Sequence, residues 1–184
     1  MTRLILILGD QLNMNLAALK TADKLHDVVV MAEVMQEATY VSHHPKKIAL
    51  ILSAMRKFSA HLKANGWKVA YSRLEDADNT QSIPGELIRY AERYEASSVI
   101  VTEPGEWRLI TLLQECPLHV TQLEDDRFIA SHAVFEKWAS GRKALRMEYF
   151  YRDMRRKTGL LMDDDKPAGG RWNFDQENRK PAPD

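Results

Sequence analysis

The sequence predicts an α/β protein built on a doubly wound parallel sheet. Short apolar runs, each about the length of one strand, alternate along the chain with helical segments, which is the pattern of βαβ units. Two of these runs, Leu4–Leu8 and Asp27–Glu33, are almost continuously apolar, as strands covered on both faces are. Since right-handed crossovers place helices on both faces of such a sheet, we expect a Rossmann-like domain with five parallel strands.

The first half of this domain begins with those two strands, joined by a short helical stretch at Asn13–Thr21. A polar turn region at residues 34–44 follows the second strand. The longest helix should run from Pro45 to Asn65, because proline suits a first helical turn and a glycine follows Asn65 as a stop signal. Its apolar residues recur at spacings of 3 and 4 and form one stripe: Ile48, Ile51, Met55, Phe58 and Leu62.

The second half of the domain continues the alternation. Three further strands are expected at Lys68–Arg73, Ser98–Thr102 and His119–Leu123. Helices at Pro84–Tyr94 and Glu106–Glu115 separate them. The α/β domain is therefore expected to span residues 1–126.

Composition excludes several classes of protein. The 184 residues are 45% hydrophobic and 28% charged, and the 26 basic residues equal the 26 acidic ones, so no overall field favours nucleic acid or a membrane. The single cysteine, Cys116, excludes an internal disulfide and any all-cysteine metal or iron–sulfur site made by this chain alone, and we expect it to be a buried small residue. The chain opens without a signal peptide pattern and contains no membrane-length apolar run, so a cytoplasmic location is expected.

The composition changes after Asp126. Between Lys137 and Leu160 there are eight basic and two acidic residues, a net charge of +6, with aromatic residues among them. We expect a helical, basic and aromatic extension at residues 127–162 and a linker or tail at residues 163–184. Arginines of the extension would bind phosphates while its aromatics stack on bases, or its aromatic face would pack on a partner domain; the second interpretation is favoured.

Polar residues gather where the predicted strands end. Gly9, Asp10 and Gln11 follow the first strand, and Glu33 and Val34 close the second. The loop after the second strand carries Glu37, Tyr40, His43 and His44, and Glu106 lies beyond the fourth strand. In an open α/β sheet, ligands bind outside the carboxyl ends of the strands where the strand order reverses, which makes the first and fourth strands neighbours there. These residues therefore predict a ligand-binding crevice.

Each of these residues also has a purely structural interpretation. Gly9 would simply end a strand, Ser42 would cap the long helix, and Glu106 would favour a helix amino terminus. The His43–His44 pair is a weak metal signal, because adjacent residues rarely point to one centre, and no metal site is predicted. Neither a dinucleotide-binding glycine motif nor a P-loop nor a nucleophile elbow is present, so the crevice is expected to bind a ligand rather than to hydrolyse one.

Four blocks in order resemble the amino-terminal part of the photolyase/cryptochrome superfamily. They are LILGDQL (Leu6–Leu12), the run Glu33–Ile48, VTEPGEWR (Val101–Arg108) and GRKALRMEYFYRDMRRKTGLLM (Gly141–Met162), and the similarity extends through Gly169–Arg179. The resemblance is greatest to the bacterial iron–sulfur branch, which comprises deoxyribodipyrimidine photolyase-related proteins, the prokaryotic (6-4) photolyases and cryptochromes.

This resemblance implies a division of labour. The α/β domain would carry an antenna chromophore, 6,7-dimethyl-8-ribityllumazine, and a larger helical domain would carry FAD, a [4Fe–4S] cluster and the DNA lesion pocket. Glu37 and Gln11 would bond the pteridine-dione edge, Asp10 and Glu106 the ribityl hydroxyls, and Tyr40 and Val34 would pack on the ring. The matched site residues are Gly9, Asp10, Gln11, Glu33, Val34, Glu37, Tyr40 and Glu106.

The resemblance also limits the expected activity. A chain of 184 residues with one cysteine would hold neither FAD nor the cluster, and would not perform the carbon–carbon lyase reaction of DNA repair by itself. Its expected partners are the chromophore, a FAD-bearing helical domain or a second copy, with DNA reached only through a full-length protein. Two other functions remain open: a nucleic-acid-binding module that uses the basic extension, and a small-molecule enzyme on a nucleotide-type fold.

Overall fold

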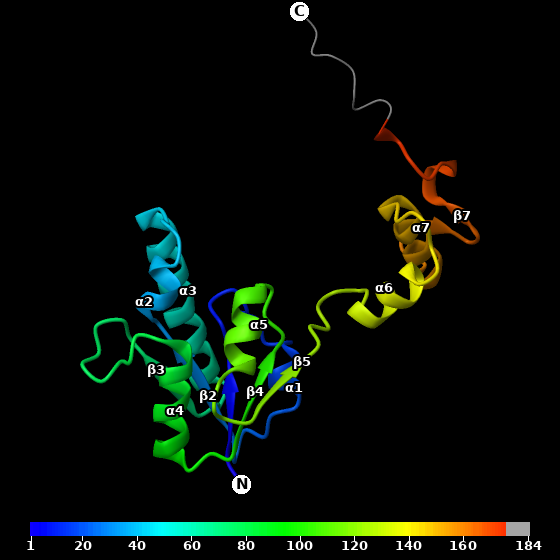
Figure 1. Ribbon diagram of the computed structural model, residues 1–184. Helices are drawn as coiled ribbons and strands as arrows, with labels where there is room; N and C mark the ends of the chain where they lie inside the picture. Colours follow the sequence, from blue (N-terminus) through cyan, green and yellow to red (C-terminus); the bar gives the residue numbers. More distant parts are fainter. Residues whose placement is uncertain (176–184) are drawn as a thin grey trace, which may run out of the picture. The chain divides into compact units, whose positions relative to one another are not determined.

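A computed structural model describes residues 1–175 of the chain, which form two compact units, Met1–Phe128 and a second one that begins at Ile129. The first unit contains a five-stranded sheet with the order β3-β2-β1-β4-β5 (Figure 1), in which every neighbouring pair is parallel. The strands are β1 (Arg3–Leu6), β2 (Val28–Ala32), β3 (Val69–Ser72), β4 (Ser98–Thr102) and β5 (Val120–Leu123). The predicted doubly wound, Rossmann-like parallel sheet is confirmed.

Helices cover both faces of this sheet. They are α1 (Ala17–Lys20), α2 (Met35–Thr39), α3 (Pro45–Ala64), α4 (Ile83–Tyr94) and α5 (Trp107–Gln114). Alternate residues of β1 go to opposite cores: Leu4 and Leu6 pack with side chains of α4 and α5, whereas Ile5 packs with side chains of α1 and α3. This two-sided burial explains why the central strands are apolar at every position.

Three local details differ from what the sequence predicts. The helix expected at Asn13–Thr21 has only four residues, because the Asn15 amide donates to Asn13 Oδ1 (2.8 Å) and holds the first part of the segment in a turn. The polar turn region at residues 34–44 contains the short helix α2. Beside it, His44 and not Ser42 caps α3, since His44 Nδ1 accepts from the Lys46 amide (3.1 Å).

The topology brings the ends of β1 and β4 together. These two strands lie side by side in the middle of the sheet, with Leu6 in register with Val101. Beyond them, the fully buried Gln11 donates from Nε2 to the carbonyl oxygens of Thr102 (2.8 Å) and Glu103 (3.2 Å). Gln11 therefore fixes the loop after β1 against the end of β4, at the point where the strand order reverses.

The second unit is small and contains two α-helices and a short antiparallel strand pair. It contains α6 (His132–Ala139), α7 (Met147–Thr158), the antiparallel pair β6 (Met162–Asp163) and β7 (Lys166–Pro167), and the 3₁₀ turn η1 (Ala168–Gly170). Its aromatic centre consists of Phe135, Trp138 and Phe150, whose ring centroids lie 5.1–5.7 Å apart. The domain limits at residues 126 and 162 stay predictions, and the end of the expected tail, residues 176–184, lies outside the described residues.

Candidate functional site

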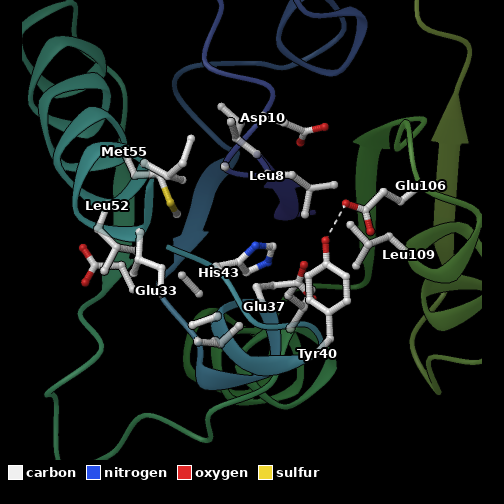
Figure 2. Close-up of a pocket in the computed structure, with 18 of the residues that line it drawn as sticks. Leu8, Asp10, Glu33, Glu37, Tyr40, His43, Leu52, Met55, Glu106 and Leu109 are labelled. Carbon is white, nitrogen blue, oxygen red and sulfur yellow. Dashed lines mark hydrogen bonds between the residues drawn. The ribbon is translucent and has the colours of Figure 1, made fainter. Parts of the chain in front are cut away.

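A cavity of about 200 Å³ lies at the carboxyl edge of the sheet (Figure 2). Its lining comes from the ends of β1 and β2, from α2 and α3, and from the first residues of α4 and α5. Figure 2 shows Leu52 and Met55 of α3 on one side and Glu106 and Leu109 on the other. The cavity therefore occupies the edge at which doubly wound sheets bind ligands.

The cavity has apolar walls and a polar rim. Buried side chains such as Leu8, Met55 and Leu109 form its walls. The polar rim, a name used below for five more accessible lining residues, consists of Asp10, Glu37, Tyr40, His43 and Glu106. An apolar hollow with a few convergent polar groups is the usual form of a small-molecule site.

Gly9 lines the cavity at the point where the chain leaves β1. A Cβ atom at this position would lie 3.2 Å from Ile51 Cγ2 and 3.2 Å from Met55 Sδ. The absence of a side chain therefore lets the apolar stripe of α3 approach the end of β1. Gly9 shapes the wall, and the apolar side chains packed over it face the cavity.

The side chains of Glu33 and Gln11 make hydrogen bonds to the protein groups around the cavity. Glu33 is among the lining residues, but its carboxylate accepts from Arg56 (2.6 and 2.7 Å), from the Tyr71 hydroxyl (2.6 Å) and from the Leu74 amide (3.1 Å). Burial alone would favour the protonated acid, but these hydrogen bonds outweigh it and lower the pKa of Glu33. Gln11 lies outside the lining residues, and its Oε1 is buried without a hydrogen-bond partner.

A network of four side chains joins α2 to the start of α5 beside the cavity. Arg108 donates to both carboxylate oxygens of Glu37 (2.8 Å each) and to Glu106 Oε2 (3.1 Å). The Tyr40 hydroxyl donates to Glu106 Oε1 (3.2 Å), drawn as a dashed line in Figure 2, and the Arg108 guanidinium lies 4.1 Å from the centroid of the Tyr40 ring. Hydrogen bonds from Arg108 to Glu37 raise the pKa of Arg108. We call this network the Arg108 bridge.

Asp10 projects from the loop after β1 and lies close to the end of β4. A Cβ atom on Gly105 would lie 3.9 Å from Asp10 Oδ2. Partial burial raises the pKa of Asp10, the nearby carboxylates of Glu106 and Asp125 act in the same direction, and Arg127 opposes them. Val34, Glu37, Tyr40 and Glu106 also line the cavity, so the structure gathers seven of the eight predicted site residues there and leaves out Gln11.

Three polar residues at the site carried weak signals or none in the sequence. His43, which the sequence left between two interpretations, lines the cavity with its ring edge-on to Tyr40, at a centroid distance of 5.2 Å. Lys47 also lines it, with Nζ 3.2 Å from His43 Nδ1. His43 lies in the segment between α2 and α3, so no helical pattern marks it, and the pairing of Arg108 with Glu37 depends on the tertiary fold.

Several arginines of the basic segment contact tryptophan rings of the same unit. The guanidinium groups of Arg152, Arg155 and Arg156 lie 5.6, 5.2 and 4.7 Å from the centroid of the Trp172 ring. The guanidinium group of Arg142 lies 4.6 Å from the centroid of the Trp138 ring. Within residues 1–175, no three His, Cys, Asp or Glu side chains are grouped as metal ligands, and no helix is long and apolar enough to span a membrane.

The fold and the cavity together define an α/β domain with a cavity at the switch point of a doubly wound sheet. The chain belongs to the deoxyribodipyrimidine photo-lyase-related protein family, whose model matches residues 5–184. It is 53% identical over 186 residues to a (6-4) photolyase of Agrobacterium fabrum, a match that covers 99% of this chain but 37% of that protein. The chain thus spans well under half the length of this relative.

Two more distant similarities were found. An uncharacterized protein of Acanthamoeba polyphaga mimivirus is 23% identical over 145 residues, which cover 74% of this chain and 71% of that protein. Among solved structures, a universal stress protein family member from Burkholderia pseudomallei matches with a TM-score of 0.33 and 18% identity, over 66% of this chain and 96% of that one.

Proposed function

We propose that this chain is the antenna-chromophore domain of a light-driven DNA-repair photolyase or a cryptochrome-like protein, and that its cavity binds 6,7-dimethyl-8-ribityllumazine. The observation that carries the proposal is the apolar cavity with a polar rim, at the ligand-binding edge of the sheet, in a member of the photolyase-related family. The family resemblance implies that FAD, a [4Fe–4S] cluster and the lesion pocket would belong to a separate helical domain, and the chain covers 37% of the longer relative. A cytoplasmic location follows from the same proposal.

The lining residues suit a flat heterocycle that carries a polyol chain. The apolar walls remove the ring from water, which is favourable at about 25 cal/mol per Å² of apolar surface. Tyr40 and His43 offer aromatic faces and edges for packing, and the Glu37 carboxylate offers an acceptor to the N–H of a dione edge. Asp10 and Glu106 accept hydrogen bonds from ribityl hydroxyls. A bound lumazine absorbs light and passes the excitation by resonance to a flavin.

The direct test is spectroscopic. We expect the purified chain to carry lumazine absorbance or to take up 6,7-dimethyl-8-ribityllumazine on titration with a dissociation constant in the micromolar range or tighter, a free energy of about −8 kcal/mol. Fluorescence and absorption changes follow the binding. A titration that leaves both spectra of the ligand unchanged contradicts the proposal.

A matched pair of tryptophan variants tests whether this cavity is the binding site. Ile48→Trp places an indole among the lining residues and should weaken lumazine binding by about 10-fold or more, equivalent to about 1.4 kcal/mol. Leu50→Trp, two residues further along the same helix at a side chain that is 68% exposed, should leave the affinity within about twofold. Equal affinities of the two variants would place the chromophore elsewhere.

The nucleic-acid alternative has less support. Four arginines of the second unit lie over its own tryptophan rings, and two of these, Arg152 and Arg156, also bond the carboxylates of Glu148 and Asp153. These contacts favour the interpretation of the basic segment as a packing element.

A further inference from the structure

We propose that the polar rim excludes phosphate, so that the cavity accepts an uncharged heterocycle bearing a polyol and rejects the phosphate monoester of the same molecule. This inference rests on the proposed function and adds to it the charge class of the ligand. In open α/β sheets, the crevice occupied by this cavity is where phosphate groups of nucleotides sit. The residues present there in this chain meet three requirements of phosphate binding poorly, and Lys47 is the one lysine or arginine among the described lining residues.

The first requirement is a set of free backbone amides after β1. In phosphate-binding loops, these amides point at the anion from the start of a helix. Here the helix that follows, α1, has only four residues. Four amides of this helix and the preceding loop already have acceptors in the protein: Gln11 N donates to Leu8 O (3.0 Å), Asn13 N to Gln11 O (2.8 Å), Asn15 N to Asn13 Oδ1 (2.8 Å) and Ala18 N to Thr102 Oγ1 (3.0 Å).

The second requirement is a helix amino terminus that is open to an anion. The helix after β4, α5, begins at Trp107, and Glu106 is its N-cap residue. The position where the helix dipole favours negative charge therefore already carries a carboxylate of the protein. That carboxylate is held by Tyr40 and Arg108 and lines the cavity.

The third requirement is a cation available to the ligand. Arg108 is engaged by Glu37 and Glu106, and Arg127, which lies near Asp10, donates to both oxygens of Asp125 (2.8 and 2.6 Å). Lys47 is the one basic residue among the lining residues of the described chain if histidine is counted as neutral, and its Nζ contacts His43. A variant of Lys47 is therefore part of the test.

The Asp10 carboxylate adds direct repulsion of a phosphate. Burial is the main cause that raises the pKa of Asp10; the nearby Glu106 and Asp125 act in the same direction, and Arg127, which is paired with Asp125, opposes them. A dianionic phosphate at the rim adds repulsion at this point. A hydroxyl, in contrast, donates a hydrogen bond to the Asp10 or Glu106 carboxylate. The same two carboxylates thus accept a ribityl chain and reject its phosphate.

The test compares two ligands that differ only in the phosphate: 6,7-dimethyl-8-ribityllumazine and its 5′-phosphate, titrated into the full chain by fluorescence. We expect the unmodified lumazine to bind at least about 10-fold tighter at low salt, and the ratio to shrink in 1 M NaCl, where the Debye length is about 3 Å. Asp10→Asn removes the charge with little change of shape and should lower the ratio at least about threefold. Glu92→Gln, an exposed carboxylate of α4, is the control and should leave the ratio unchanged.

The possible outcomes separate this inference from the proposed function. Equal binding of both ligands, tighter binding of the phosphate, or a ratio that neither Asp10→Asn nor Glu106→Gln alters would overturn the exclusion while the chromophore site stands. A Lys47→Gln variant that weakens the phosphate ester alone shows a cation serving the phosphate and also overturns it. Failure of both ligands to bind removes the proposed function and this inference together.

Discussion

At the scale of single residues, buried carboxylates of the first unit are held by dense hydrogen bonding. Glu86 is 1% exposed and accepts from Arg89, Ser72 and the Thr80 amide and hydroxyl. Burial favours its neutral form, but the hydrogen bonds from these groups prevail and lower its pKa to about 2. The folded protein therefore holds the Glu86 carboxylate ionised at a pH where an unfolded chain would protonate it.

This pKa predicts a pH dependence of stability. Since the pKa of Glu86 falls on folding from 4.5 to about 2, its contribution is complete above pH 4.5 and is lost as the pH falls toward 2. The contribution is of the order of 3 kcal/mol. Glu86→Gln should flatten the fall in unfolding free energy below pH 4.5, as measured by urea denaturation from pH 3 to 7. The exposed Glu92→Gln should keep the slope of the parent, and an unchanged slope for Glu86→Gln would contradict the assignment.

The same scale shows how far sequence reasoning reaches. Asp10, Glu37 and Glu106 were predicted because residues that follow parallel strands meet at one edge, whatever their partners. The role of Glu33 was not predictable in this way, since its carboxylate is taken by Arg56 and Tyr71, whose positions depend on how α3 and β3 pack. Strand topology predicts where a residue lies but not which neighbour its side chain bonds.

At the scale of elements, the strands and long helices were predictable and the short ones were not. Five strands and α3, α4 and α5 were expected within a few residues of their observed limits, because apolar runs and helical stripes repeat over enough residues to be distinct. Helix α2 has five residues and none of them is buried, so it has no apolar stripe to detect. It nevertheless supplies Glu37 and Ala38 to the cavity.

The Arg108 bridge is expected to slow the dissociation of a bound ligand. It ties α2 to α5 through a bidentate pair, a geometry that arginine provides and lysine does not. Arg108→Lys keeps the positive charge but removes the bidentate pair with Glu37. We therefore expect lumazine to dissociate about 10-fold faster, a change of about 1.4 kcal/mol. Stopped-flow displacement measures the rate. Arg73→Lys, at an exposed arginine, is the control, and identical dissociation rates of all three proteins would show that the bridge does not restrain the ligand.

At the scale of the whole molecule, net charge is distributed unequally along the chain. The stretch from Lys137 to Leu160 carries a net charge of +6, and the rest of the chain therefore carries −6. Sequence composition showed this contrast, but it did not show that guanidinium groups of the stretch lie over Trp172 and Trp138, since stacking requires the fold of the second unit. The polar rim of the cavity belongs to the first unit, and the basic segment belongs to the second.

The division into two units predicts that the first is sufficient for binding. Every residue that lines the cavity, and both hydrophobic cores around the sheet, fall within residues 1–128. A chain cut after Phe128 should therefore unfold cooperatively on heating and bind 6,7-dimethyl-8-ribityllumazine within about threefold of the full chain, because no lining side chain is lost. The same truncation with Ile48→Trp is the matched negative control. If the truncated chain is folded but binds at least about 10-fold more weakly, residues beyond 128 contribute to the site, and the proposal that the α/β unit alone holds the chromophore is wrong.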